Sequence, residues 1–177
     1  MDNSTHKSCI VTGANSGLGY WTTLEMSKQG WTVYMLCRSA DKAEAAQKEI
    51  IFKTQNPNIH IILVELSSLK SIQQAVDTIK SKTDGIDVLI NNAALVSSYR
   101  SLTETGVELQ FAVNHLAPFY LTHLALDLLK TSKDARIVNI SSNNHKKGKI
   151  HFEDISLKRN YQISKKIPYE HLLNITT

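Results

Sequence analysis

The sequence contains no long apolar run and few cysteines, and both absences limit the class of protein that it encodes. No run approaches the roughly 20 apolar residues that a membrane-spanning helix needs. The amino terminus, MDNSTHKS, is polar and lacks the basic and then apolar order of a secretion signal. Without such a signal, we expect a cytoplasmic protein with no membrane span, in which Cys9 and Cys37 are free, buried thiols.

The net charge of +4 raises the question of a nucleic-acid partner. The basic residues gather late in the chain, in HKKGK (145–149), in LKR (157–159) and at Lys165 and Lys166. A nucleic-acid site needs aromatic side chains that stack on bases, and residues 145–149 contain none. We therefore expect solvated loop charge and no nucleic-acid partner, and we predict no metal site.

Short apolar segments rich in β-branched residues alternate with helical patterns along the chain. Helical patterns cover residues 17–29, 40–53, 69–79 behind the capping candidates Ser67 and Ser68, and about 105–130. The expected strands are residues 8–13, 31–37, 59–66, 87–91 and 136–141. This alternation predicts an α/β protein with a Rossmann-like, doubly wound parallel sheet. We expect one domain over residues 1–177, with an incomplete sheet of about five strands that lacks its last strands.

A glycine-rich turn, TGANSGLG (12–19), directly follows the first expected strand and opens the first expected helix. Gly13 permits the tight turn, Gly17 lets backbone N–H groups approach a pyrophosphate, and Gly19 lets the helix pack closely on the strand. The alternative is a tight turn that binds no ligand. Because strand, turn and helix coincide, we predict a dinucleotide site that contains Thr12, Gly13, Ala14, Asn15, Ser16, Gly17, Leu18 and Gly19.

The end of the second expected strand indicates which dinucleotide is bound. An acidic residue there would bind the ribose 2′-hydroxyl and repel a 2′-phosphate. The sequence instead has Arg38 followed by Ser39, and a guanidinium matches a phosphate in charge and geometry. The alternative is a solvated arginine at a strand end. We predict NADP(H) rather than NAD(H).

The spacing of the glycines resembles the short-chain dehydrogenase/reductase family, whose members carry T-G-x-x-x-G-x-G. Two further motifs follow in that family's order. Glu65-Leu66 ends the third expected strand, where the resemblance implies that a carboxylate accepts a hydrogen bond from the adenine amine. NNAA (91–94) follows the fourth strand. The resemblance adds Asn91, Asn92 and Ala93 to the cofactor site.

The resemblance also supplies candidate catalytic residues. FAVNHLAPFYLT (111–122) resembles the family's long helix with its catalytic asparagine, here Asn114. Pro118 has no N–H to bond the Asn114 carbonyl, so we expect a kinked helix and a carbonyl able to hold a water. RIVNISS (136–142) matches the fifth strand, and its register implies Ser142 as the catalytic serine, with Ser141 as the alternative.

The carboxy-terminal residues carry a tyrosine and a lysine at the family's spacing. YQISK (161–165) places Tyr161 one helical turn before Lys165, whose charge would stabilise a phenolate. Pro168 would break a helix that begins near Tyr161, and Tyr169 is an alternative. We therefore interpret residues 161–177 as a divergent or truncated end.

The segment HKKGKIHFEDI (145–155) resembles the retinol-dehydrogenase-like branch of the family. The resemblance implies hydride transfer between NADP(H) and a small-molecule carbonyl or alcohol substrate, with Asn114, Ser142, Tyr161 and Lys165 as the catalytic residues. The alternative is a non-catalytic remnant that binds nucleotide or a partner. An exposed fifth strand further predicts self-association.

Overall fold

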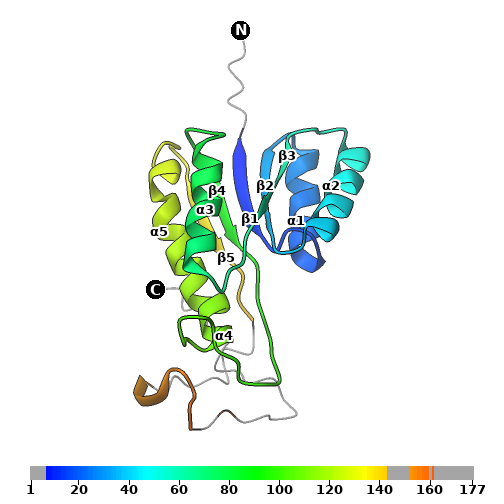
Figure 1. Ribbon diagram of the computed structural model, residues 1–177. Helices are drawn as coiled ribbons and strands as arrows, with labels where there is room; N and C mark the ends of the chain where they lie inside the picture. Colours follow the sequence, from blue (N-terminus) through cyan, green and yellow to red (C-terminus); the bar gives the residue numbers. More distant parts are fainter. Residues whose placement is uncertain (1–6, 143–151, 160, 162–177) are drawn as a thin grey trace.

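The computed structural model describes residues 7–142, 152–159 and 161, and its centre is a parallel β-sheet (Figure 1). The spatial order of the strands is β3-β2-β1-β4-β5, and all four pairings are parallel. This confirms the predicted Rossmann-like α/β class with five strands. The strands are β1 (Ser8–Thr12), β2 (Thr32–Cys37), β3 (Ile59–Leu63), β4 (Val88–Asn91) and β5 (Arg136–Asn139).

Helices cover both faces of the sheet (Figure 1). On one face, α1 (Gly17–Lys28) packs beside α2 (Ala40–Thr54); on the other, α3 (Leu69–Lys80) packs beside α5 (Ala117–Leu129). Each face has its own apolar core, and Cys9 and Cys37 are free and buried in the first one, as predicted. Among the described residues, no helix has the length and apolar character needed to cross a membrane.

Helix α3 shows how the sequence pattern becomes packing. Its apolar residues Ile72, Val76 and Ile79 are all buried, because their spacing places them on one side of the helix. The Ser68 side chain accepts a hydrogen bond from the backbone N–H of Ser71 at 3.3 Å and so caps the helix. Of the two predicted caps, Ser68 therefore holds this position.

The helix expected over about 105–130 begins later than predicted. Residues 103–107 form a turn, in which the Thr103 N–H donates to the Val107 carbonyl at 2.8 Å. Glu108 then caps a short helix α4 (Leu109–Phe111). A π-helical segment (Ala112–Leu116) leads into α5, whose first turn contains Pro118. The π-helical segment ends two residues before Pro118, and the kink predicted at Pro118 stays a prediction.

Strand β5 lies at one edge of the described sheet. It pairs with β4, while its Ile137 and Val138 side chains are 43% and 39% exposed. The third and fifth strands end at Leu63 and Asn139, earlier than the sequence pattern predicted. The edge position that we expected for β5 is confirmed for the described part of the chain.

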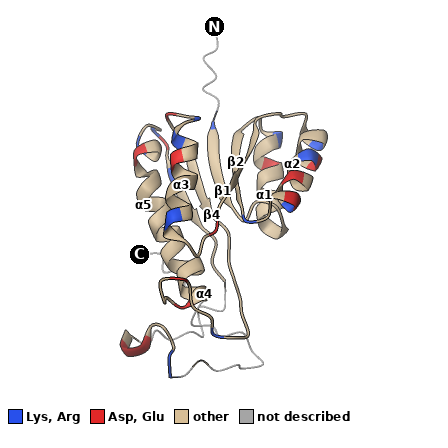
Figure 2. Cartoon of the chain, in the orientation of Figure 1, with Lys and Arg blue, Asp and Glu red and all other residues tan. Residues whose placement is uncertain are grey.

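Charged side chains of both signs are mixed on the outer helices. Figure 2 shows basic and acidic residues side by side on α2 and on α3. The basic stretch 145–149 and the pair Lys165 and Lys166 lie outside the described residues. A short 3-10 helix (Phe152–Asp154) belongs to the last described stretch.

Candidate active site

The candidate site lies where the strand order reverses. Strand β1 has β2 on one side and β4 on the other, so the connections from β1 and β4 diverge at their carboxyl ends. In open α/β sheets, ligands bind in the crevice at this point. The glycine turn follows β1, Arg38 follows β2, and the NNAA segment follows β4. The fold therefore brings together the three sequence motifs that were predicted to bind a dinucleotide.

The three glycines of the turn differ in what surrounds them. Gly13 has φ +64°, and its N–H donates to the Leu36 carbonyl at 2.9 Å, which fixes the turn against β2. A Cβ on Gly19 would lie 2.2 Å from the Gly13 carbonyl oxygen, so only glycine fits there. Gly17 has φ +52°. Apart from its two chain neighbours and the backbone of the first turn of α1, no described atom lies within 4 Å of a Cβ built on it. Space for a ligand is therefore present at Gly17.

The start of helix α1 suits an anion. Ser16 is its N-cap residue, but in the described chain the Ser16 side chain makes no capping hydrogen bond. The first turn of α1 contains no acidic residue. A bound anion at the positive end of the helix dipole would therefore meet no negative side chain from this turn. Ser16, Gly17 and Leu18 are all exposed. These features fit the pyrophosphate of a dinucleotide.

Ala14 and Asn15 are tied to the end of β2. Their backbone groups form hydrogen bonds with Cys37, which oppose the effect of burial on the thiol. Burial nevertheless raises the pKa of Cys37 to about 11. Cys37 is therefore a protonated thiol at neutral pH, and it packs against the glycine turn at Ala14 and Asn15.

Thr12 joins the turn to the segment after β4. Its Oγ1 accepts hydrogen bonds from the backbone N–H groups of Asn92 and Ala93, both at 2.9 Å. The Asn92 side chain in turn donates from Nδ2 to the Thr12 carbonyl at 2.9 Å. Asn92 and Ala93 are thus held beside the glycine turn, as their predicted role requires.

Asn91 differs from its neighbours because its side chain points into the protein. It is 2% exposed, and Nδ2 donates to Asn139 Oδ1 at 2.9 Å and to Thr122 Oγ1 at 3.3 Å. These bonds tie β4 to β5 and to α5. The Asn91 side chain therefore supports the site from within the fold.

Arg38 and Ser39 lie on the other side of the turn, after β2. Arg38 is exposed and forms no hydrogen bond or ion pair with any described residue. Ser39 is the N-cap residue of α2, and no capping hydrogen bond from its side chain occurs in the described chain. Both side chains are available for a ligand at the end of β2.

Glu65 and Leu66 follow β3 and contact their own loop. Glu65 Oε1 accepts from the Ser67 backbone N–H at 3.1 Å and from Ser67 Oγ at 2.9 Å. Leu66 packs against the apolar core that lies under α3 and α5. These bonds use only Oε1, so Oε2 could accept from an adenine amine. The predicted role of Glu65 stays a prediction.

Asn114 is 2% exposed and holds the chain after β4 with both ends of its amide. Its Oδ1 accepts from the Leu95 N–H at 2.7 Å, and its Nδ2 donates to the Leu95 carbonyl at 2.8 Å. The side chain therefore organises the wall of the site. The predicted role of the Asn114 carbonyl in holding a water stays a prediction.

Tyr161 contacts the same wall. Its hydroxyl accepts from Gln110 Nε2 at 2.9 Å and lies 3.1 Å from the Ser97 carbonyl and 3.0 Å from the Tyr99 carbonyl. Burial, together with the charge of Glu108, raises the pKa of Tyr161 above its ordinary value. These contacts favour a packing role for Tyr161.

Of the other predicted catalytic residues, the structure describes the two serines and not the lysine or the second tyrosine. Ser142 follows β5 and is half-buried, whereas Ser141 is exposed. Lys165 and Tyr169 lie outside the described residues. Sequence reasoning missed Gln110, which is 1% exposed, because no local pattern indicates its distant partners Ser97 and Tyr161.

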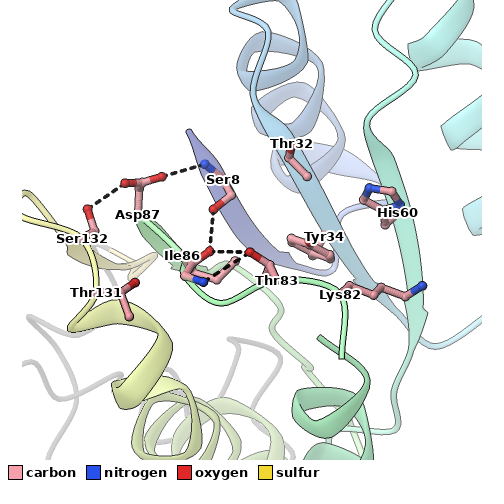
Figure 3. Close-up of a pocket in the computed structure, with 11 residues that line it drawn as sticks. Ser8, Thr32, Tyr34, His60, Lys82, Thr83, Ile86, Asp87, Thr131 and Ser132 are labelled. Atoms are coloured by element: carbon pink, nitrogen blue, oxygen red, sulfur yellow. Dashed lines mark hydrogen bonds between the residues drawn. The ribbon is translucent and has the colours of Figure 1, made fainter. Parts of the chain in front are cut away.

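A pocket of about 510 Å³ lies at the opposite edge of the sheet, near the amino ends of the strands (Figure 3). Asp87 accepts from the Ser8 N–H at 2.8 Å and from Ser132 Oγ at 2.7 Å, and Ser8 Oγ donates to the Gly85 carbonyl at 3.0 Å. These polar groups satisfy one another. They lie at the amino ends of the strands and are separate from the candidate site.

Known proteins provide an independent comparison. The family model described as short chain dehydrogenase matches residues 7–154. Retinol dehydrogenase 13 of Mus musculus is 43% identical over 159 residues, which are 90% of this chain and 46% of that protein. Retinol dehydrogenase 11 of Homo sapiens is 38% identical over 169 residues, which are 96% of this chain and 53% of that protein.

A solved structure agrees with these sequence matches. An uncharacterized protein from Mycobacterium paratuberculosis has a TM-score of 0.72 and 33% identity, over 92% of this chain and 55% of that one. The chain thus spans about half the length of the relatives that it matches. The family model covers most of the chain, and its glycine turn, NNAA segment and strand order all lie within that match. The chain belongs to the short-chain dehydrogenase family.

Proposed function

We propose that the chain binds NADP(H) and serves hydride transfer between this cofactor and a carbonyl or alcohol substrate. The observation that carries the proposal is the open position at Gly17. Its φ of +52° and the empty space around it leave room for a pyrophosphate beside the start of α1. When bound, the nicotinamide of NADP(H) supplies or accepts the hydride.

Arg38 supports the choice of NADP(H) over NAD(H). The exposed guanidinium follows β2, the strand whose end contacts the adenosine ribose in dinucleotide-binding folds. It has no described carboxylate partner that would neutralise it. A 2′-phosphate would supply that partner, with charge-assisted hydrogen bonds to the guanidinium.

The chemical roles follow from the residues around the carboxyl ends of β4 and β5. We assign Ser142 to hold the substrate oxygen by its hydroxyl, and Asn114 to organise the wall between β4 and the helix. A tyrosine hydroxyl would give or take the proton, with Lys165 lowering its pKa. Tyr161 and Tyr169 are the candidates, and the hydrogen bonds of Tyr161 support a packing role for that residue.

The names of the relatives support one substrate class for the first test. Two of them are retinol dehydrogenases by name, and the chain is 38% to 43% identical to them. An apolar primary alcohol or aldehyde, such as retinol or retinal, is therefore the first substrate to test on this chain.

The test combines binding and turnover. Purified protein is mixed with NADPH and a panel of aldehydes and ketones that includes retinal, and cofactor oxidation is followed by absorbance. Oxidation above the rate without protein supports the proposal. NADPH binding without oxidation supports the alternative of a non-catalytic nucleotide-binding protein, and the absence of both contradicts the proposal.

A further inference from the structure

The segment after β4 is attached to the protein at several successive points. Asn92 and Ala93 bind Thr12, as described above, and Leu95 binds the Asn114 amide. Two residues further on, the Ser97 N–H donates to Gln110 Oε1 at 3.0 Å. Alternate residues of the segment are thus bonded to the helix that runs from Leu109 into α5.

Gln110 and Asn114 lie on the same side of this helix, and each forms a hydrogen bond with the segment. They are four residues apart, a spacing that places side chains on one helical face. Both are buried, at 1% and 2% exposure. A buried amide that uses both its oxygen and its nitrogen fixes its partners strongly, because breaking either bond leaves a buried polar group unsatisfied.

Tyr161 closes the arrangement from a distant part of the sequence. The Gln110 amide donates to its hydroxyl at 2.9 Å, while that hydroxyl also contacts the Ser97 and Tyr99 carbonyls at 3.1 and 3.0 Å. One phenol therefore bridges the helix and the segment. Gln110 contacts both the segment and the phenol, so it is the centre of this small network.

We propose that Gln110 and Tyr161 are positioning residues that hold residues 95–99 in place and thereby shape the nicotinamide half of the cofactor site. The proposal rests on the proposed function. The segment starts after β4, where Asn92 bonds to Thr12 just before the glycine turn. In the proposed function, the dinucleotide crosses from the β2 side to the β4 side at this point. Arg38 serves the adenosine half on the β2 side, so residues 95–99 face the other half.

Because residues 95–99 should contact only the nicotinamide half, two ligands can distinguish their effect from that of Arg38. NADPH contains both halves, whereas adenosine 2′,5′-bisphosphate contains only the adenosine half and its 2′-phosphate. If residues 95–99 are held less firmly, the affinity for NADPH should fall by roughly 3- to 10-fold, which is the effect of one net hydrogen bond. The affinity for adenosine 2′,5′-bisphosphate should stay within about twofold.

The experiment compares Tyr161→Phe and Gln110→Met with wild type. Phenylalanine keeps the ring, and methionine keeps the volume while removing both hydrogen bonds. Dissociation constants for both ligands are measured by calorimetry, and hydrogen exchange is measured at residues 95–99. We expect weaker NADPH binding and faster exchange at these residues in both variants.

Matched controls use the same residue types elsewhere. Gln47→Met removes an amide that donates to the Ile59 carbonyl at 2.6 Å, and Tyr120→Phe removes a hydroxyl 3.4 Å from Gln73 Oε1. Neither control should change the ratio of the two affinities. Equal weakening of both ligands, or unchanged exchange at residues 95–99, would overturn the proposal.

The wild type separates this proposal from the proposed function. If the wild type binds neither ligand, the proposed function fails. In that case, exchange at residues 95–99 in Tyr161→Phe still decides whether this hydroxyl holds the segment, since that measurement needs no ligand.

Discussion

At the scale of single residues, the glycine turn shows two different reasons for the same residue type. Gly19 is required because another backbone carbonyl occupies the position of a Cβ, only 2.2 Å away. Gly17 is favoured by its φ of +52° and by the open space that we assign to a pyrophosphate. The first requirement concerns the fold, and the second concerns the ligand.

We therefore predict that two alanine substitutions differ in their effect on NADPH binding. Gly19→Ala should destabilise the fold by about 1–3 kcal/mol, since the carbonyl must move away from the new Cβ. Gly17→Ala should lower the free energy of unfolding by about 1–2 kcal/mol, because alanine is strained at a left-handed φ. It should also strongly weaken NADPH binding, because the new methyl group lies in the space that we assign to the pyrophosphate. Urea unfolding and NADPH titration measure the two effects. Unchanged NADPH binding in Gly17→Ala would contradict the assignment.

The buried thiol below the turn gives a prediction about alkaline pH. Burial raises the pKa of Cys37 from 9.0 to about 11, so the folded state keeps a proton that the unfolded state loses. The free energy of unfolding should therefore fall as pH rises from 9 to 11, by roughly 2 kcal/mol from this group.

Cys37→Ala isolates that contribution. The variant should be less sensitive to pH over the same interval, because alanine does not titrate, while the other alkaline groups remain. Parallel slopes for wild type and Cys37→Ala between pH 9 and 11 would show that the thiol is not the cause.

At the scale of elements, the start of the helix before α5 depends on one buried carboxylate. Glu108 is 0% exposed and accepts hydrogen bonds from the N–H groups of Gln110 and Phe111, at 3.1 and 2.8 Å. It sets the first residue of the helix that carries Gln110 and Asn114. The cap thus controls the position of both amides that hold the segment after β4.

Glu108→Ala should consequently lower the free energy of unfolding by about 1–2 kcal/mol, the usual cost of a lost helix cap. It should also speed exchange at residues 95–99. The exposed Glu104 provides the control, since Glu104→Ala removes the same charge four residues earlier. Similar stability of both variants would argue against a capping role.

The sequence predicted most elements because their signals are local. The strands are short apolar runs, the glycine turn has its own spacing, and the apolar positions of α3 repeat every helical turn. The helix start near residue 105 was wrong, because the turn at 103–107 and the Glu108 cap interrupt the pattern. Gln110 could not be predicted, since its partners lie 13 and 51 residues away.

At the scale of the whole molecule, strand β5 forms an edge of the described sheet and carries exposed apolar side chains. Parallel strands are usually covered on both faces and paired on both sides, yet Ile137 and Val138 are 43% and 39% exposed. In the described part of the chain, β5 pairs with a strand on one side only. An edge of this kind can pair with a strand of another chain. We therefore expect the 177-residue chain to self-associate through β5.

Val138→Lys should reduce this association, because a lysine on an edge strand opposes pairing. Sedimentation velocity of wild type and variant measures it, and NADPH should raise the melting temperature of both without removing the association. The comparison variant is Leu63→Lys on β3, the other edge of the sheet, where Leu63 is 54% exposed. A monomeric wild type, or an equal effect of Leu63→Lys, would exclude β5 as the contact.

We propose that NADP(H) binds at the carboxyl ends of the strands through the glycine turn and Arg38. The most direct measurement is a titration of NADPH and NADH against wild type and Arg38→Ala. A lost charge-assisted phosphate contact costs about 1.5–3 kcal/mol, so wild type should bind NADPH roughly 10- to 100-fold more tightly than Arg38→Ala does. NADH affinity should be similar in both proteins. Equal affinities of the wild type for NADPH and NADH, or binding of neither, would contradict the account.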